Sequence, residues 1–402
     1  DILGLTPLIF SMMGLSASVP KDGKPRLQLV GPLGLRAFLR ATLSITYASL
    51  SSHFIVHELL WPSQPAYPHN PEGISTFSYT EQDSYLPEGV RGQVRTLPLL
   101  PPHENELPGR DIRMNESTCT WPSILQLSNV TISAAPITHR CPTVGYVFQE
   151  GPTASRSVSQ EELAIIDSNK DALFELYNIR SPRSLLSRVM RDRETITLPD
   201  GHVLSPPPLD RPGRKLCILG DTSDATAGLV GRGMACLARD ADLLVHECTY
   251  ASMNAEDMEM ARIESEEHAQ MLRKSLLGVQ EAETRALSRG HSVPRIVGSF
   301  SGEIRARRVV LNHFSARLPA PVVSTEAPLT STHQLKQGTP FKNSVKQFYV
   351  MREIERQVTK YWHASLPEEF REFVKNDNAV AAFDGLAIDI APHSAPTERN
   401  TA

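Results

Sequence analysis

The segment Lys215–Thr222 reads Lys-Leu-Cys-Ile-Leu-Gly-Asp-Thr, a short apolar run that stops at a glycine and an aspartate. Two later segments share this pattern: Asp242–Thr249 reads Asp-Leu-Leu-Val-His-Glu-Cys-Thr, and Val309–Ser315 reads Val-Val-Leu-Asn-His-Phe-Ser. Short runs rich in Val, Leu and Ile that end at Gly or polar residues are typical of buried strands. They would place an Asp, a Glu and a His at strand ends, where a sheet presents reactive groups. A carboxylate and imidazoles that converge there are the side chains that a zinc hydrolase needs.

The bulk composition is that of a globular protein. The chain has 402 residues, 40% of them hydrophobic and 21% charged, with a formal net charge of -4. The chain as a whole therefore does not attract polyanions, and any contact with nucleic acid requires a local basic patch. No apolar run is long enough to span a bilayer, so no membrane partner is expected. The five cysteines are scattered without a Cys-x-x-Cys pair, which indicates a reducing, intracellular compartment.

The order of the apolar patterns predicts an α/β protein. Strand-like patterns occur at residues 26–30, 53–58, 126–150 and 379–390, and helical spacing occurs at residues 33–44 and 350–374. Strands and helices interleave along the chain without an internal repeat.

Four segments do not fit this alternation. Residues 61–112 carry many prolines and are expected to form a largely irregular surface insertion. Residues 151–196 are expected to be an excursion with helical pieces and a basic run. Residues 251–289 are charged and helix-prone, and residues 319–345 are polar and expected to be a loop.

Six motifs carry a family resemblance. Thr138–Tyr146 reads Thr-His-Arg-Cys-Pro-Thr-Val-Gly-Tyr, Gly290–Val293 reads Gly-His-Ser-Val, and His313–Leu318 reads His-Phe-Ser-Ala-Arg-Leu. Residues 28–58, 213–222 and 246–249 supply the other three motifs. Taken in their order along the chain, the six resemble the motifs of tRNase Z, in particular its short form, within the metallo-β-lactamase superfamily. Single tetrapeptides are weak evidence, but an ordered set of this kind is specific.

The resemblance implies a single metallo-β-lactamase-like domain over residues 1–402, folded as an αβ/βα sandwich. It also implies two Zn²⁺ ions, removal of the 3′ trailer from precursor tRNA, and a homodimer. By position, His139 would bind the first zinc, Asp221 would bridge both, and His313 would bind the second. Glu247 would orient His291, which would protonate the leaving 3′ oxygen. Two zinc ions about 3.5–4 Å apart can clamp both oxygens of an in-line phosphoryl displacement.

The front of the chain departs from this pattern. The family's His-x-His-x-Asp-His motif directly precedes the stretch that resembles Ile2–Leu5, but only Asp1 precedes it here. Asp1 is either the aspartate of that motif or occupies the place of its last histidine. We therefore expect a sandwich without its first strands, a sheet with an unfilled edge, and a metal site open on one side. Little bound zinc and no trailer cleavage are expected from residues 1–402.

Residues 151–196 are the candidate arm for gripping tRNA. The family's Pro-x-Lys-x-Gly signature is replaced by Ser181-Pro182-Arg183 and scattered arginines. Arg183, Arg188 and Arg191 are the candidate RNA-binding residues, with a solvated basic face as the alternative.

Several readings compete with the catalytic one. His246 is expected to be a buried structural histidine beneath the site rather than a metal ligand. His291, which precedes Pro294, could instead cap a helix. For the whole chain the alternative is a non-catalytic scaffold of the same fold that binds RNA or a protein. Another phosphodiesterase of the superfamily is disfavoured, because it would lack the His-Glu-x-Thr and Gly-His-Ser boxes.

Overall fold

The chain folds into two compact units. The computed structural model describes residues 2–13, 24–66, 74–78, 94–98, 100–154, 158–253, 277–316, 318 and 342–393. Unit 1 comprises residues 1–148 and 215–388, and unit 2 comprises residues 149–214 and 389–402. The predicted catalytic and metal-binding residues all fall in unit 1, and the three predicted RNA-binding arginines fall in unit 2.

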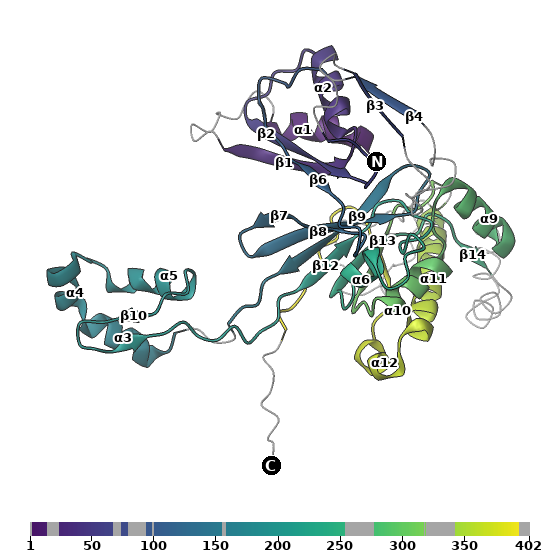
Figure 1. Cartoon of the computed structure of the whole chain (residues 1–402). Coiled ribbons are helices and arrows are strands. Elements are labelled where there is room, and N and C mark those ends of the chain that lie inside the picture. The colour runs from purple at the N-terminus through teal and green to yellow at the C-terminus, as the bar shows by residue number, and fades with distance from the viewer. Residues whose placement is uncertain are drawn as a thin grey trace. The chain divides into compact units, whose positions relative to one another are not determined.

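The first sheet of unit 1 is four-stranded and parallel. Strand β1 (Pro25–Pro32) pairs with β2 (His53–Leu60), which also pairs with the short strands β5 (Glu106–Leu107) and β6 (Asp111–Arg113). Helices α1 (Leu5–Met13) and α2 (Leu35–Ile45) cover one face of this sheet (Figure 1). The predicted strands at 26–30 and 53–58 and the predicted helix at 33–44 are thus confirmed.

Buried ion pairs join the end of the predicted insertion to this sheet. The Arg36 guanidinium lies 3.2 Å from Glu58 on β2 and 2.6 Å from Asp111 on β6. The Arg40 guanidinium lies 2.7 Å from Glu106 on β5. The expectation of a largely irregular segment is therefore wrong for residues 106–107 and 111–112, which pair with β2 and belong to the sheet. Within the same segment, β3 (Ile74–Ser78) and β4 (Val94–Pro98) form an antiparallel hairpin.

The second sheet has seven strands in the order β17-β16-β13-β12-β9-β8-β7. Their bounds are β7 (Trp121–Leu127), β8 (Val130–Ile137), β9 (Thr143–Glu150), β12 (Lys215–Ile218), β13 (Leu243–Glu247), β16 (Val309–Asn312) and β17 (Val380–Ala381). The pairs β12–β13, β13–β16 and β16–β17 are parallel. Parallel strands are normally covered on both faces, which explains their near-continuous apolar sequences. The three predicted central strands are confirmed.

Helices cover the outer face of this second sheet. The largest buried cluster joins it to α6 (Gly233–Leu237), α10 (Pro294–Glu303) and α11 (Lys342–Ser365), which lie beside β12 and β13 in Figure 1. The predicted helix at 350–374 is two helices, since Pro367 separates α11 from α12 (Glu368–Val374). The predicted strand at 379–390 is wrong in length. Only Val380 and Ala381 pair, with a β16 that is itself four residues long, and the chain then turns at Gly385 with φ 89°.

The inner faces of the two sheets share a second core. It contains Leu59 and Trp61 from the end of β2, and Trp121 and Ile124 from β7. The rings of Trp61 and Trp121 meet edge to face with centroids 4.8 Å apart. The layers of unit 1 are therefore helices, sheet, sheet, helices, and the predicted αβ/βα sandwich of an α/β protein is confirmed.

Unit 2 has a small core of its own. Helices α3 (Gln160–Ser168), α4 (Lys170–Tyr177) and α5 (Leu185–Met190) pack with the hairpin β10 (Ile196–Thr197) and β11 (Val203–Leu204). Their shared buried side chains are Ile166, Leu173, Leu185, Val189, Leu198 and Leu204.

The other predicted insertions lie largely outside the described residues. Of 251–289, residues 254–276 are not described. The remainder forms a short pair of strands, β14 (Ser252–Met253) and β15 (Leu277–Gly278), followed by helix α9 (Val279–Arg289). Residues 319–341 of the predicted loop and Asp1 also lie outside. Among the described helices, none combines the length and the apolar character needed to span a membrane.

Candidate metal and acid–base site

The parallel strands of the second sheet bring the predicted residues to one edge. Ile218 on β12 is in register with Val245 on β13, and Glu247 on β13 is in register with Asn312 on β16. The carboxyl ends of these strands therefore meet. Asp221 lies three residues after the end of β12, Glu247 is the last residue of β13, and His313 directly follows β16. This arrangement follows directly from the apolar runs and their stops.

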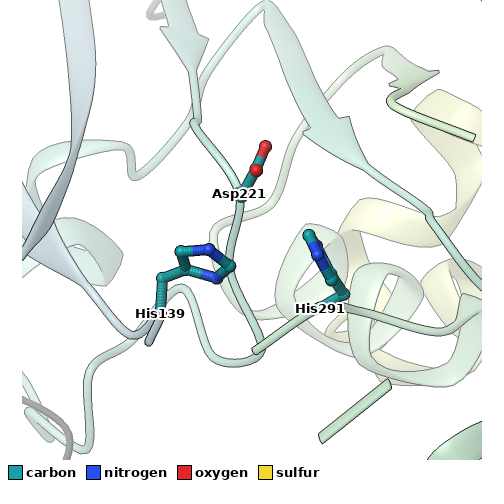
Figure 2. A group of neighbouring side chains, drawn as sticks. All are labelled: His139, Asp221 and His291. Atoms are coloured by element: carbon teal, nitrogen blue, oxygen red, sulfur yellow. The ribbon is translucent and has the colours of Figure 1, made fainter. Parts of the chain in front are cut away.

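His139 and His291 reach the same place from other elements. His139 follows β8, where Thr138 forms a bridge to Asp224 in the loop after Asp221. His291 lies between helices α9 and α10. One ligand atom each from His139, Asp221 and His291 lies within 4.8 Å of the other two (Figure 2). The structure thus gathers three residues that are far apart in the sequence.

The backbone at Gly290 holds His139 in place. His139 Nδ1 lies 2.6 Å from the Gly290 carbonyl oxygen, which accepts its hydrogen bond. Gly290 ends helix α9 in a left-handed conformation with φ 76°. A Cβ at this position would lie 2.6 Å from His139 Nδ1, so both the backbone angle and the close approach require glycine.

Glu247 is a buried carboxylate whose two oxygens are occupied by donors. Oε1 accepts from the Thr222 N–H at 2.9 Å and from His291 Nδ1 at 2.9 Å. Oε2 accepts from the Thr249 N–H at 3.0 Å and from the Thr249 hydroxyl at 2.6 Å. Glu247, His291 and His313 also form a compact group with ligand-type atoms within 4.8 Å. Both oxygens of Glu247 therefore already accept hydrogen bonds, one of them from His291.

His313 lies opposite Asp221. Its Nε2 is 3.5 Å from Asp221 Oδ1, and its Nδ1 is 2.8 Å from the Thr249 hydroxyl. The His291 and His313 rings stack with centroids 5.2 Å apart. His313 has a φ of 55°, which is uncommon for a residue other than glycine and is concentrated at functional sites.

The hydrogen bonds leave one nitrogen of each histidine available. Nδ1 of His139 faces a carbonyl and Nδ1 of His291 faces a carboxylate, so each carries the proton. The Nε2 atom of each ring is then free, either to bind an ion, as is usual for metal-binding histidines, or to exchange a proton. With the Asp221 carboxylate, this donor set fits zinc, which prefers imidazole nitrogen and carboxylate oxygen.

His246 lies under the site and belongs to neither group. It is fully buried, its Nδ1 is 2.7 Å from the Glu247 carbonyl oxygen, and its ring packs against Phe300. Burial away from solvent lowers the pKa of His246 below its usual value. These contacts agree with the structural role expected from the sequence.

The alternative capping role of His291 is not what the structure contains. The residue at the N-cap of α10 is Val293, and no side chain caps that helix. The Ser292 hydroxyl instead donates to the Thr222 carbonyl at 2.5 Å, which ties the two loops together.

Sequence reasoning missed the residues that orient the others. Thr222, Thr249 and Gly290 stand inside the motifs, yet no role was predicted for them. The available signal was their position: each lies within two residues of a predicted site residue at the end of an element. Their contacts are made by backbone groups and one hydroxyl, which leave no pattern of their own in a single sequence.

The three predicted RNA-binding arginines lie in unit 2 and are all paired with acids. The exposed pairs, with their N–O distances, are Arg183 with Asp167 at 2.6 Å, Arg188 with Glu194 at 2.6 Å and Arg191 with Asp192 at 2.8 Å. The Asp192 and Asp167 carboxyls have lowered pKa values because each accepts hydrogen bonds from its arginine. Local pairing reduces the net positive charge of this face.

The chain is similar in sequence to curated zinc phosphodiesterases and ribonucleases. It is 27% identical over 336 residues to zinc phosphodiesterase ELAC protein 1 of Mus musculus, covering 83% of this chain and 74% of that protein. The Homo sapiens protein of the same name is 26% identical over 316 residues, covering 78% and 69%. Ribonuclease Z of Myxococcus xanthus is 24% identical over 266 residues, covering 60% and 69%. These relatives confirm the resemblance to tRNase Z.

No model of a known protein family matches the chain. Human tRNase Z, short form (ELAC1), has a TM-score of 0.38 and 21% identity, covering 79% of this chain and 69% of that one. At this TM-score the superposition is too loose to compare individual residues.

Proposed function

We propose that this site hydrolyses phosphodiester bonds in RNA, and that its substrate is precursor tRNA, from which it removes the 3′ trailer. The observation that carries the proposal is the Glu247–His291 pair, joined at 2.9 Å, beside a carboxylate and two further histidines. An acid held by a carboxylate next to a metal-type donor set is what phosphodiester cleavage requires. The similarity to zinc phosphodiesterases and ribonuclease Z supports the same reaction.

Zinc is the cofactor in this proposal. His139 and His313 would each hold one ion and Asp221 would bridge the two. Bound zinc would supply Lewis-acid stabilisation of phosphate oxygens and would make water a stronger nucleophile at neutral pH. Gly290 and Thr249 would keep the rings of His139 and His313 correctly oriented.

His291 is the proposed general acid. Its Nδ1–H donates to Glu247, so the ring cannot rotate freely and its Nε2 is the atom that exchanges protons. Because Nδ1 faces Glu247, the proton to be donated in the reaction would be carried on Nε2. In the reaction this proton passes to the 3′ oxygen that leaves as the phosphodiester bond breaks.

Unit 2 is the proposed contact for the body of the tRNA. Arg183, Arg188 and Arg191 would exchange their carboxylate partners for RNA phosphates. An exposed ion pair contributes little to stability, so this exchange costs little.

A homodimer is also part of the proposal. Light scattering coupled to size-exclusion chromatography should give about twice the 44.4 kDa mass of one chain. A mass of one chain at all concentrations would contradict it.

The test of function is cleavage of a 3′-extended precursor tRNA with added Zn²⁺, by residues 1–402 and by a protein that also carries a His-x-His-x-Asp-His motif before Ile2, from which we expect the cleavage. We expect His291→Ala to slow single-turnover cleavage by about 10²–10⁴-fold, the usual contribution of general acid catalysis, with little change in RNA affinity. Glu116→Gln, at an exposed position of unit 1 outside the site, is the control and should leave the rate unchanged. RNA binding without any cleavage by the protein that carries this motif would instead support a non-catalytic scaffold.

A further inference from the structure

The Thr249 hydroxyl connects the two sides of the site. Thr249 follows Glu247 by two residues and is 5% exposed. Its Oγ1 lies 2.6 Å from Glu247 Oε2 and 2.8 Å from His313 Nδ1. It is also 3.4 Å from His291 Nδ1 and 2.9 Å from the His313 carbonyl oxygen. One small side chain thus touches both the proposed acid and its carboxylate, and a proposed zinc ligand.

The direction of these hydrogen bonds can be deduced. A threonine hydroxyl has one proton to donate and two lone pairs that accept. Its shortest contact is with the Glu247 carboxylate, and a charged acceptor forms a stronger bond than a carbonyl or an imidazole nitrogen. The proton therefore points to Glu247, and the contact with His313 must be a bond in which Nδ1 donates to Oγ1.

This direction determines the tautomer of His313. With the proton on Nδ1, the lone pair of His313 is on Nε2, the atom that lies 3.5 Å from Asp221 Oδ1. In the other tautomer, Nε2–H would point to Asp221. The lone pairs of Nδ1 and of the Thr249 hydroxyl oxygen would then face each other, because the hydroxyl proton points to Glu247. Only the first form presents a lone pair where the proposed function needs one.

The backbone reinforces the same contact. The Ser315 N–H donates to the Thr249 carbonyl at 3.0 Å, so the turn containing His313 is bonded to Thr249 on both sides of the ring. His313 adopts its left-handed φ of 55° within this turn. The hydroxyl and the backbone bond together hold a conformation that is unfavourable for an isolated histidine.

We propose that Thr249 is a positioning residue that fixes the Nδ1–H tautomer of His313 and couples this histidine to the Glu247–His291 pair. The inference deepens the proposed function, on which it rests for the identity of the reaction. The tautomer, however, is a property of the metal-free protein. It can therefore be tested even if the protein does not cleave RNA.

The test compares Thr249→Val with Thr249→Ser. Valine keeps the shape and removes the hydroxyl, whereas serine keeps the hydroxyl. Two-bond ¹⁵N–¹H correlation spectra of the metal-free protein, labelled at histidine, report the protonated nitrogen of each ring, and His313→Gln identifies the His313 signals. We expect wild type and Thr249→Ser to show the Nδ1–H form of His313, and Thr249→Val to show the Nε2–H form or a mixture.

Metal affinity supplies a second readout. Loss of a group that orients a ligand typically lowers metal affinity about 10–100-fold, so Thr249→Val should bind Zn²⁺ more weakly by that factor and Thr249→Ser should not. Thr120→Val is the matched control, because Thr120 is 6% exposed and its hydroxyl bonds only to Thr118 among the described contacts. It should leave both the His313 spectrum and the zinc affinity unchanged.

An unchanged His313 tautomer in a folded Thr249→Val protein would overturn the inference. Circular dichroism of each variant shows whether it is folded. If Thr249→Val does not fold, Thr249→Ala and the serine variant decide by the same spectra. Failure of cleavage by a protein that also carries the His-x-His-x-Asp-His motif, with the expected tautomers, would count against the proposed function alone.

Discussion

At the scale of single residues, the site depends on the buried carboxylate of Glu247, each of whose two oxygens accepts two hydrogen bonds. Glu247 receives four hydrogen bonds from Thr222, Thr249 and His291 and is 1% exposed. A buried carboxylate needs such partners, because an unpaired buried charge costs several kcal/mol. The same bonds hold the loops after β12 and β13 and the loop before α10 in one arrangement.

Glu247→Gln tests this role. The amide places an NH₂ group where at least one oxygen now accepts from a donor, so donors will face each other. We expect a loss of about 1–3 kcal/mol in the free energy of unfolding, the cost of an unsatisfied buried polar group. The rate of precursor-tRNA cleavage should fall as well. Denaturant titration checks the stability, with Glu116→Gln, an exposed carboxylate in unit 1, as control. Equal stability of the two variants would mean that the four bonds contribute nothing.

Gly290→Ala tests the contact with His139. The new Cβ would lie 2.6 Å from His139 Nδ1 and 3.0 Å from the Arg140 nitrogen, in addition to the strain of φ 76°. Gly228→Ala separates the two effects, because Gly228 has φ 66° and nothing within 4 Å of its Cβ position. A left-handed residue costs about 1–2 kcal/mol, so the control should lose that amount in unfolding free energy. Gly290→Ala should lose more and should also weaken zinc binding, measured by calorimetry.

At the scale of elements, helix α10 packs against α11 through glycines. Gly298 and Gly302 stand four residues apart on one face of α10, and the backbone of α11 lies directly against them. The Ser301 hydroxyl, also buried, bonds back to the Val297 carbonyl. Close approach of these helices covers the sheet whose edge carries Asp221 and Glu247, so their packing supports the site at a distance.

Gly298→Ala should therefore be strongly destabilising. Its Cβ would lie 2.5 Å from Tyr361 Cβ and 2.6 Å from the Val358 carbonyl oxygen, and neither atom is the flexible end of a side chain. Overpacking typically costs about 1–3 kcal/mol, and contact with backbone favours the upper part of that range. Thermal unfolding measures it. Gly4→Ala, which has nothing within 4 Å, should unfold within about 0.5 kcal/mol of wild type, as surface changes usually do. Similar melting temperatures for the two variants would contradict the packing argument.

At the scale of the whole molecule, charge is balanced locally. The net charge is -4, and Arg183, Arg188 and Arg191 of unit 2 are paired with neighbouring acids. RNA binding through these arginines would release counterions from the RNA and would weaken as salt rises.

The triple variant Arg183→Ala, Arg188→Ala, Arg191→Ala should raise the KM for precursor tRNA and leave kcat nearly unchanged. Each lost phosphate contact should also reduce the slope of log affinity against log salt by about 0.7–0.9. Filter binding at several salt concentrations measures this slope. Arg285→Ala, an arginine of α9 paired with Glu281, is the control. An unchanged slope in the triple variant would identify these arginines as a solvated surface.

Buried histidines make the stability of the fold depend on pH. Burial lowers the pKa of His246 from 6.5, and burial with nearby arginines lowers the pKa of His57. Above about pH 6.5 these rings are neutral in both the folded and the unfolded chain. Below it the unfolded chain binds protons that the folded chain does not, so the free energy of unfolding falls as the pH falls. Burial raises the pKa of Glu58 and Glu355, so above about pH 4.5 the folded chain binds protons that the unfolded chain does not. These two groups therefore lower the free energy of unfolding as the pH rises.

His246→Asn isolates one of these contributions. Urea unfolding at pH 7.5 and pH 5.5 should show a smaller loss of stability for the variant than for wild type, because asparagine does not titrate. An amide can also replace the Nδ1–H that faces the Glu247 carbonyl. The same loss in both proteins would mean that His246 is protonated equally in the folded and unfolded states.

The sequence by itself determined the central strands and the residues at their ends. A strand that is buried on both faces must be apolar along its whole length, so the stops at Asp221, Glu247 and His313 are visible without a structure. The ordered motifs supplied the position of His139 and the pairing of Glu247 with His291. Both the αβ/βα sandwich and the convergence of these side chains could therefore be predicted.

Only the tertiary structure decided what orients those side chains. The Gly290 carbonyl faces His139 across 151 residues of chain, and the Thr249 hydroxyl faces His313 across 64. Likewise, an ion pair with Arg36 fixes Asp111 in the first sheet, and Arg183 of unit 2 is paired with Asp167. Each of these contacts depends on where distant backbone and short polar groups come to lie after folding. Local apolar periodicity carries no information about such contacts, because it records which side of an element is buried and not which group faces it.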